Sequence, residues 1–596
     1  MKSKPLLPLP VSWEECEKRN WDAVDIVLVS GDAYIDHPSF GIALIGRLLE
    51  SQGYRVAMLA QPEYQDATDF RRFGKPRLFF GISAGNLDSI VANYSSNGKV
   101  RDRDAYSPHG SPWRSGEKSR KNRYRPDRAA LIYSNLARQA YPDATLVLGG
   151  IESSLRRFVH FDYQQNLLRG SQLSDAKADL LIYGMAETAI SRVAAAFAEE
   201  KSVSGFAGTC IRMTDSQFQT FTEQLPAEQK LTILPSFTEI TDNPELFLKA
   251  ELAIDRHARQ YSSKILAQKQ QAVWVVQFPP SAPLHTKAFD ALYQLGFSRK
   301  AHPANQQIPA EKMIRDSVTV VRGCPGNCSF CAISRHQGPA TVSRSVTSVL
   351  TELQSIADQP EFSGTISDLG GPTANLFGTE CSIGSCASHD CLFPTVCKNL
   401  LTDEKKSLEL LDKALQINGI KQVFISSGLR MELLRKTPEL FRKIVLHHTP
   451  GAMKIAPEHT EDHLLQIMHK EPHQDLLDFT RDFKKICKQG GSHRQITPYI
   501  ISAHPGCTEA DTKAMVKKLQ RAGLSVRQFQ DFTPSPGTIS TAMYVSERDR
   551  RNNKPLYVAK KQAERNRQRK IIEDTFLTRK KNKKQNLGSP RSRHRS

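Results

Sequence analysis

Residues 322–333 read RGCPGNCSFCAI and place three cysteines, Cys324, Cys328 and Cys331, in one short stretch with the spacing C-x3-C-x2-C. The residues just before them, DSVTVV at 316–321, have the pattern of a short buried strand. Three thiolates from one loop can hold three irons of a 4Fe–4S cluster, which leaves the fourth iron without a ligand from this motif. An open coordination position is what a catalytic metal site requires. A zinc site or three unrelated thiols are the alternatives, but zinc sites favour paired CxxC units.

The chain around and beyond this loop alternates between strand-like and helix-like segments. Strands are expected over 316–324, 364–371, 421–428, 453–459, 495–506 and 525–536. Helices are expected between them, over 343–357, 405–416, 438–448, 473–490 and 509–523. This series predicts a partial or full (βα) barrel over residues 310–547, with its reactive groups at the carboxyl ends of the strands.

The N-terminal part of the chain shows a similar alternation. Strand patterns followed by glycine or small polar residues recur at 24–30, 144–150 and 178–184. Strands that alternate with helices predict a parallel sheet with both faces covered, so we expect an α/β domain over residues 1–200. Residues 201–309 are less regular and are expected to be a connector.

Basic residues are concentrated in two places. The formal net charge is +20, and residues 548–596 alone hold 18 Lys and Arg against 4 Asp and Glu. We expect this stretch to be a basic tail, with a helix docked by Ile571, Ile572 and Phe576 and with disorder beyond Leu577. The second place is a polar insertion over 95–128, with Trp113 and Tyr124 interleaved; it is either a solvated loop or a contact for nucleic acid or phosphate.

Cysteine usage and hydropathy indicate the compartment. Seven of the eleven cysteines lie between Cys324 and Cys397, which points to metal or redox chemistry rather than to a disulfide framework. The sequence has no apolar run long enough to span a membrane and no secretory signal. These features predict a cytoplasmic protein that does not associate with a membrane.

The cysteine loop and several further motifs resemble the radical S-adenosylmethionine (SAM) superfamily, and within it the YgiQ-type family. The motifs are GDAYIDHPSFG at 31–41, LGGIESSLRR at 148–157, GTISDLGGPTANLFG at 364–378 and MKIAPEHT at 453–460. The resemblance implies an N-terminal flavodoxin-like, cobalamin-binding-like domain followed by a (βα)6 partial TIM barrel. It also implies that a reduced 4Fe–4S cluster cleaves SAM to a 5′-deoxyadenosyl radical, which abstracts hydrogen from an unknown substrate. A flavodoxin or ferredoxin would supply the electron.

The same resemblance assigns roles to residues at the strand ends. Phe330 would lie beside the adenine of SAM. Gly370, Gly371, Pro372 and Thr373 stand where the superfamily contacts the methionine amino group, although the usual acidic residue is missing. Ser426, Ser427 and Arg430 would hold the ribose and the carboxylate, since a guanidinium donates to a carboxylate in pairs.

Three groups of residues leave their chemistry open. Lys454, Glu458 and His459 end the fifth strand and either move protons or form a salt-bridged barrel rim. A second cysteine set binds an auxiliary Fe–S cluster, a structural zinc or no metal; its members are Cys381, Cys386, Cys391 and Cys397. Cobalamin-binding domains usually carry D-x-H-x-x-G, but Asp36 and His37 are adjacent here, so cobalamin is unlikely.

The substrate is not readable from these motifs. The basic tail and the basic insertion suggest RNA or a ribonucleoprotein. The alternative to a radical enzyme is a non-catalytic Fe–S protein that binds nucleic acid through its tail. The glycine and serine motifs at the strand ends favour the enzyme.

Overall fold

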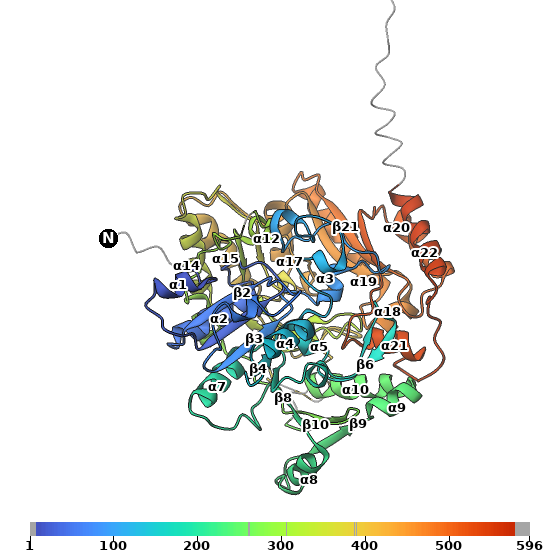
Figure 1. The fold of residues 1–596 in the computed structure, drawn as a ribbon. Coiled ribbons are helices and arrows are strands. Elements are labelled where there is room, and N and C mark those ends of the chain that lie inside the picture. The colour runs from blue at the N-terminus through green and yellow to red at the C-terminus, as the bar shows by residue number, and fades with distance from the viewer. Residues whose placement is uncertain are drawn as a thin grey trace, which may run out of the picture.

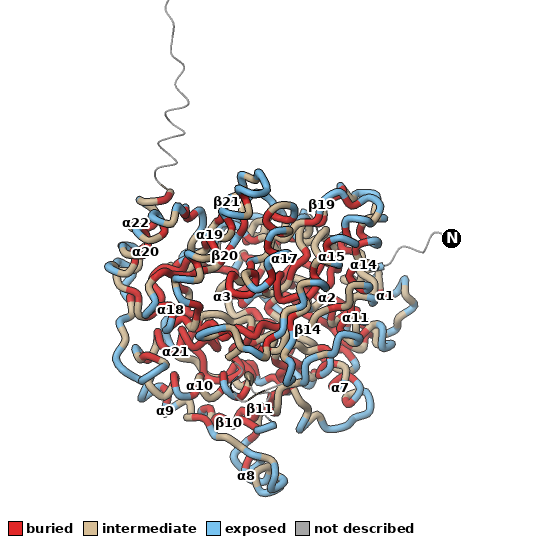
Figure 2. Tube along the Cα trace, turned by 180° about the vertical axis from the view of Figure 1, so that it is seen from behind, coloured by how far each residue is buried: buried red, intermediate tan, exposed pale blue. Residues whose placement is uncertain are grey.

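The computed structural model describes residues 7–259, 263–305, 307–384, 386, 388 and 390–577. Two α/β halves pack side by side, the N-terminal half in blue and green and the C-terminal half in yellow to red (Figure 1). Buried residues run through both halves (Figure 2). Within the described ranges, no helix is both long and apolar enough to cross a membrane.

The N-terminal half is built on one nine-stranded sheet with the order β2-β1-β3-β4-β7-β8-β11-β10-β9. Its first five strands are parallel, and they are β2 Val56–Ala60, β1 Ile26–Ser30, β3 Phe79–Ser83, β4 Leu146–Leu148 and β7 Leu180–Ile182. Helices such as α2 Gly41–Ser51, α4 Ala129–Ala140 and α7 Glu187–Ala198 pack against it. Two hydrophobic clusters form around these strands, as expected for a parallel sheet covered on both faces.

The sheet continues through the range that the sequence predicts to be a connector. The four added strands are β8 Thr209–Met213, β9 Leu231–Leu234, β10 Ile265–Lys269 and β11 Trp274–Gln277. The pattern VWVVQFPP at 273–280 does indicate the strand β11, but β8, β9 and β10 were missed because this range lacks the regular strand–helix alternation of the first half. The prediction of a connector over residues 201–309 is therefore wrong for residues 209–277, which contain four strands of the sheet.

The insertion at 95–128 is not a simple solvated loop. Arg125 is buried, and it bridges Asp32 and Asp104 with its Nη1 2.9 Å from the Asp104 carboxylate. The guanidinium of Arg123 lies 5.2 Å from the ring centre of Trp113. Much of the basic and aromatic character that suggested nucleic-acid contact is thus used inside the fold.

The C-terminal half contains parallel ladders that follow the chain order. Strand β12 Ser317–Thr319 pairs with β16 Asp368–Gly370, β15 Thr365–Ile366 pairs with β19 Gln422–Val423, and β20 Ala452–Glu458, β21 Gln495–Ser502 and β22 Gln528–Asp531 form a third group. A parallel bridge between Leu429 and Ile455 connects the second group to the third. Helices α14 Val346–Ala357, α15 Glu404–Gln416, α19 His473–Gln489 and α20 Glu509–Arg521 share one hydrophobic core with these strands. The carboxyl ends of the strands therefore lie on one side.

The two halves also share a hydrophobic core. Phe161 and Phe247 of the N-terminal half pack in one cluster with Met468 and Tyr544 of the C-terminal half. The rings of Phe161 and Tyr544 are 5.7 Å apart. This contact holds the N-terminal sheet against the strands of the C-terminal half.

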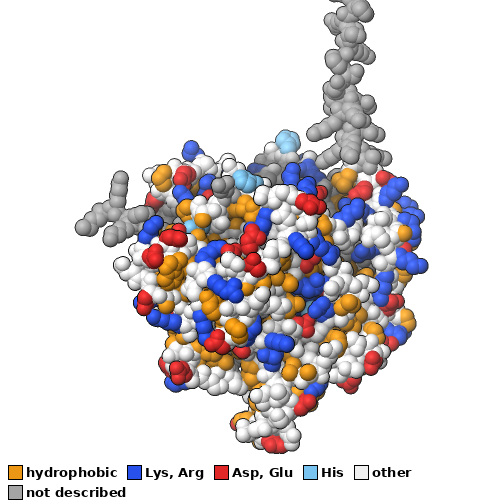
Figure 3. Space-filling model, viewed as in Figure 1, with side chains coloured by type: hydrophobic (Ala, Val, Ile, Leu, Met, Phe, Trp, Pro, Cys, Tyr) orange, Lys and Arg blue, Asp and Glu red, His pale blue; other side chains and the backbone are white. Residues whose placement is uncertain are grey.

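The described part of the basic tail is integrated into the fold. The expected helix is α22, Gln562–Phe576, and it packs against α20 with Ile572 buried in the core of the C-terminal half. The side chain of Gln568 is fully buried and accepts a hydrogen bond from the backbone N–H of Ala503 at 3.0 Å. Lys and Arg gather on the surface over α20 and α22 (Figure 3). The expectation that residues from 548 onward pack poorly is therefore wrong as far as Leu577, although the expected helix is present. The disorder expected beyond Leu577 concerns residues outside those described.

Candidate active site

The three-cysteine loop leaves β13, Val321–Arg322, through a tight turn. Cys324 and Cys328 are buried and Cys331 is half-buried. Gly323 has φ +78°, and a Cβ there would collide with the carbonyl of Ala340, so only glycine fits. A Cβ on Gly326 would collide with the guanidinium of Arg430. These two glycines let the loop fold tightly beside Arg430.

Arg430 places a positive charge against the thiols of the cysteine loop. Its Nη2 lies 3.3 Å from Sγ of Cys328 and 3.8 Å from Sγ of Cys324, and its Nη1 is 3.1 Å from Glu432. Burial alone would lower the pKa of Arg430, but the thiols of Cys328 and Cys324 raise it well above its usual value. The arrangement places a permanent positive charge where deprotonated sulfurs would need one.

The loop fits a cluster of several irons. Burial raises the pKa of Cys331 to about 12, so this thiol keeps its proton until a metal displaces it. No three metal-ligating side chains in the described ranges converge as they would on a single ion. Convergence is not needed for a 4Fe–4S cluster, because each thiolate binds a different iron.

Three of the strand-end residues assigned to SAM, Gly370, Ser426 and Ser427, come together around Asp368, which the sequence analysis did not single out. One oxygen of Asp368 accepts from the backbone N–H groups of Ser426, at 2.7 Å, and Ser427, at 3.1 Å. The other oxygen accepts from the Ser427 hydroxyl. A Cβ on Gly370 would collide with Asp368 and Ser427, and one on Gly371 with Val321. The signal for Asp368 was its place two residues before this glycine pair.

Phe330 and Thr373 are the remaining residues assigned to SAM whose surroundings the structure describes. The ring of Phe330 meets the buried ring of His504 edge-on, with 6.3 Å between the ring centres. Thr373 is buried beside the short helix η4, Ala374–Leu376. Their roles toward SAM stay predictions.

The predicted Glu–His pair does not form. Burial raises the pKa of Glu458 to about 7, and its charged neighbours are Lys470, Glu471 and Arg430. The side chain of His459 points elsewhere, with Nε2 3.6 Å from Sγ of Cys507, and burial lowers its pKa to about 3. Glu458 has φ +64° and the register of β20 shifts between Ile455 and Glu458, so the strand is irregular at the point where the two side chains diverge.

Lys454 is exposed on β20 between the buried residues Met453 and Ile455. Those two neighbours pack in the barrel core, so Lys454 occupies the other face of the strand. The structure does not bring it into contact with Glu458 or His459.

Three charged residues that the sequence analysis missed lie beside Arg430. Lys470 and Glu471 are buried and form an ion pair of 3.0 Å, and Glu432 is buried next to Arg430. One oxygen of Glu458 and one of Glu432 are buried without a hydrogen-bond partner. No spacing rule connects these positions, which are brought together only by the fold.

The second cysteine set gathers near the first. Burial, with a smaller contribution from the neighbouring Cys397, Cys386 and Cys381, raises the pKa of Cys391 to about 12. Asp390 connects the two sets. Its Oδ1 lies 2.9 Å from Nε2 of His469 and 3.5 Å from the side-chain amide nitrogen of Asn327 in the three-cysteine loop. Whether these four thiols bind a metal stays a prediction.

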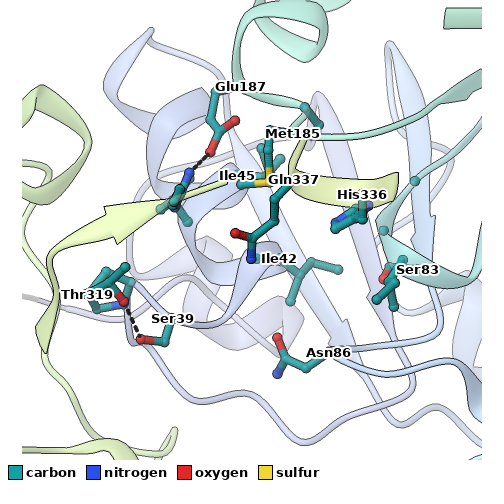
Figure 4. Close-up of a pocket in the computed structure, with 18 of the residues that line it drawn as sticks. Ser39, Ile42, Ile45, Ser83, Asn86, Met185, Glu187, Thr319, His336 and Gln337 are labelled. Carbon is teal, nitrogen blue, oxygen red and sulfur yellow. Dashed lines mark hydrogen bonds and ion pairs between the residues drawn. The ribbon is translucent and has the colours of Figure 1, made fainter. Parts of the chain in front are cut away.

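A cavity of about 590 Å³ lies between the two halves. It is bounded by residues that follow the carboxyl ends of β1, β3, β4 and β7 and by β12, β16 and the helix α13, Ile333–Gln337. Ile42, Ile45, Ser83, Asn86, Met185, His336 and Gln337 surround it (Figure 4). Gly370, Gly371, Pro372 and Ser427 also line it, so the cavity opens onto the strand ends assigned to SAM.

Comparison with known proteins identifies the superfamily first. The family model described as "Radical SAM N-terminal" matches residues 8–317, and the model described as "Radical SAM superfamily" matches residues 318–525. The chain belongs to the radical SAM superfamily and is an enzyme whose reaction is unassigned. This class uses a 4Fe–4S cluster and SAM.

Relatives then give the family. A UPF0313 protein of Thermotoga neapolitana is 40% identical over 574 residues, covering 95% of this chain and 98% of its own. One of Vibrio vulnificus is 40% identical over 594 residues, covering 90% and 76%. Within the superfamily the chain therefore belongs to the YgiQ-type family, UPF0313.

Solved structures resemble the chain more distantly. The radical SAM methyltransferase TsrM of Kitasatospora setae, with cobalamin and a [4Fe-4S] cluster bound, has a TM-score of 0.49 at 13% identity and covers 86% of this chain and 74% of its own. OxsB, a cobalamin-dependent SAM radical enzyme with aqua-cobalamin bound, has a TM-score of 0.47 at 11% identity, covering 85% and 53%. At these values the likeness carries nothing about cofactors, and the expectation that cobalamin is unlikely gains no support from it.

Asp368 supplies a first prediction. Asp368→Ala should raise the KM for SAM at least tenfold, because the Ser426–Ser427 turn loses the acceptor that fixes it. Asp368→Asn should have a smaller effect, since its amide oxygen can still accept from both backbone N–H groups. The measurement is the KM for SAM in reductive cleavage, and equal effects of the two substitutions would contradict the role of the acceptor.

Glu458 supplies a pH prediction for the protein without bound groups. A carboxyl whose pKa rises from 4.5 to about 7 on folding stabilises the fold below pH 4.5 and loses that contribution as pH rises through 7. Glu458→Gln should therefore remove a decline of roughly 1–3 kcal/mol in unfolding free energy over that interval. Denaturant unfolding at several pH values measures this, with the exposed Glu380→Gln as the control.

Proposed function

We propose that this chain is a radical SAM enzyme whose catalytic cluster is held by Cys324, Cys328 and Cys331. The observation that carries the proposal is the contact of Arg430 with two of the three thiols, at 3.3 and 3.8 Å. A structural loop of thiols has no need of a buried guanidinium, whereas an anionic metal–thiolate site is stabilised by one. When bound and reduced, the cluster supplies the electron that cleaves SAM to methionine and a 5′-deoxyadenosyl radical, which takes hydrogen from a substrate.

The fold that we infer for this function has two parts. The parallel order β2-β1-β3-β4-β7 matches the flavodoxin-like order 2-1-3-4-5, which supports a flavodoxin-like N-terminal domain. The ladders from β12 to β22 support a (βα)6 partial barrel. In both parts, ligands are expected at the carboxyl ends of the strands.

Each residue of the site has a distinct task in this proposal. Arg430 balances the charge of the thiolates and lies within reach of an acid group on a ligand of the open iron. Asp368 fixes the Ser426–Ser427 turn. Glu458, buried and half-protonated near neutral pH, holds a proton beside Lys470 and Glu471. An electron donor such as a flavodoxin or ferredoxin completes the reaction.

The direct test is anaerobic reconstitution with iron and sulfide, reduction with dithionite and measurement of 5′-deoxyadenosine. Cys328→Ala should abolish both the cluster and 5′-deoxyadenosine, because three ligands leave no spare thiolate. Cys487→Ala, a buried cysteine on α19, is the matched control and should change neither. Product formation by Cys328→Ala would refute the assignment. A full cluster without any product would favour the non-catalytic Fe–S protein.

Metal analysis of the same preparations tests the second cysteine set. If Cys381, Cys386, Cys391 and Cys397 hold an auxiliary cluster, the wild type should contain about eight irons per chain. The triple alanine variant of Cys324, Cys328 and Cys331 should then retain about four. One zinc per chain in that variant would identify a structural zinc site instead, and neither metal would leave plain thiols.

A further inference from the structure

The cavity between the two halves is lined mainly by apolar side chains. Ile42 and Ile45 of α2 and Met185 after β7 point toward it (Figure 4). Further aliphatic residues complete the walls, among them Leu28, Val147, Ile151, Ile182, Val318 and Ile333. A volume of about 590 Å³ falls within the range of about 300–1,000 Å³ that is typical of small-molecule sites.

Gly149 leaves part of this space open. A Cβ built on Gly149 would meet no atom within 4 Å. Its φ is −155°, so the backbone there is extended and any residue could adopt it. The absence of a side chain at this position is therefore not required by the backbone, and it enlarges the cavity.

Two buried polar atoms in the cavity wall lack partners. Oε1 of Glu187 pairs with Arg322, but Oε2 is buried without a hydrogen bond, and Glu187 is 5% exposed. Nδ1 of His336 is also buried without a partner, and burial lowers the pKa of His336 to about 4. Gln337 turns its side-chain amide toward the same space (Figure 4). Unsatisfied buried groups are costly, so a ligand that donates hydrogen bonds here would be stabilised.

The charge of the walls excludes anions. Arg322 is the single Lys or Arg among the described residues that line the cavity, and Glu187 neutralises it. Asp368 adds a second carboxylate, so the walls carry one more negative than positive charge. A phosphate or carboxylate would be buried beside a carboxylate without a free cation, which is strongly unfavourable.

We propose that this cavity binds the substrate, and that the substrate is a compact, largely apolar, neutral or cationic molecule with N–H or O–H donors. The identification of this ligand as the substrate rests on the proposed function, because the cavity opens onto Gly370 and Ser427. A nucleotide of RNA carries a phosphate and does not fit this chemistry. Any contact with RNA would have to be made outside the cavity.

Three probes that share one ring test the site: 2-naphthamide, 2-naphthylmethylamine and 2-naphthoate. Equilibrium dialysis with the reconstituted protein should show saturable binding of the amide and the amine, with the carboxylate at least tenfold weaker. Gly149→Leu fills the open space and should weaken the amide at least tenfold. Ser51→Leu adds the same side chain on the exposed surface of α2 and should leave all three affinities unchanged.

Glu187→Gln gives an independent readout. It leaves the guanidinium of Arg322 without its carboxylate partner, so the preference should reverse and the carboxylate should then bind more tightly than the amine. If Gly149→Leu fails to fold, as judged by its unfolding midpoint, Ile42→Trp fills the cavity from α2 instead.

The outcomes separate the two claims. No saturable binding of any probe below 1 mM, or equal affinity for the three charges, would overturn the cavity assignment. Probe binding without 5′-deoxyadenosine formation by the wild type would overturn the proposed function while leaving the ligand site intact.

Discussion

The approach of the Arg430 guanidinium to the three-cysteine loop is the interaction on which the site depends. It requires glycine at position 326, because any larger residue would occupy the position of the guanidinium. It also requires Glu432, Lys470 and Glu471 nearby, since several charges are buried together and each needs an opposite partner. The cysteine loop, the turn after β19 and the segment 469–472 just before α19 are thus joined at one electrostatic centre.

Asp368 extends this centre to the second and fourth strands. The carboxylate binds two consecutive backbone N–H groups, and this fixes the turn that carries Ser426 and Ser427. The glycine motif at Gly370 and Gly371 lacks its usual acidic residue, but the strand carries an acidic residue, Asp368, two positions before Gly370. Its oxygens are occupied by the protein, so it positions the turn rather than offering an open acceptor.

The sequence was informative wherever chemistry is local. The C-x3-C-x2-C spacing and the resemblance of further motifs identified the superfamily and the family, and the glycines after strands predicted where the site lies. It failed where partners come from distant segments. The charged group around Arg430 joins residues from four parts of the chain. The strand β8, which pairs antiparallel with β7 and β11, shows no local pattern. The Glu458–His459 pair failed at an irregular strand end, where Glu458 has φ +64° and the register of β20 shifts between Ile455 and Glu458.

The insertion at 95–128 shows the same limit. Composition suggested a polyanion-binding surface, but Arg125 is used to neutralise Asp32 and Asp104 in the interior. A basic residue in a sequence therefore does not indicate a nucleic-acid partner until the carboxylates that pair with it in the fold are known.

The cavity has walls from both halves of the molecule, because α2 and the ends of β3, β4 and β7 face β12 and β16 across it. A ligand bound there would contact both halves at once and would stabilise their association. These contacts would add to the shared core of Phe161, Phe247, Met468 and Tyr544. Because such a ligand binds only when both halves are folded together, its binding would raise the free energy of unfolding of the two halves jointly.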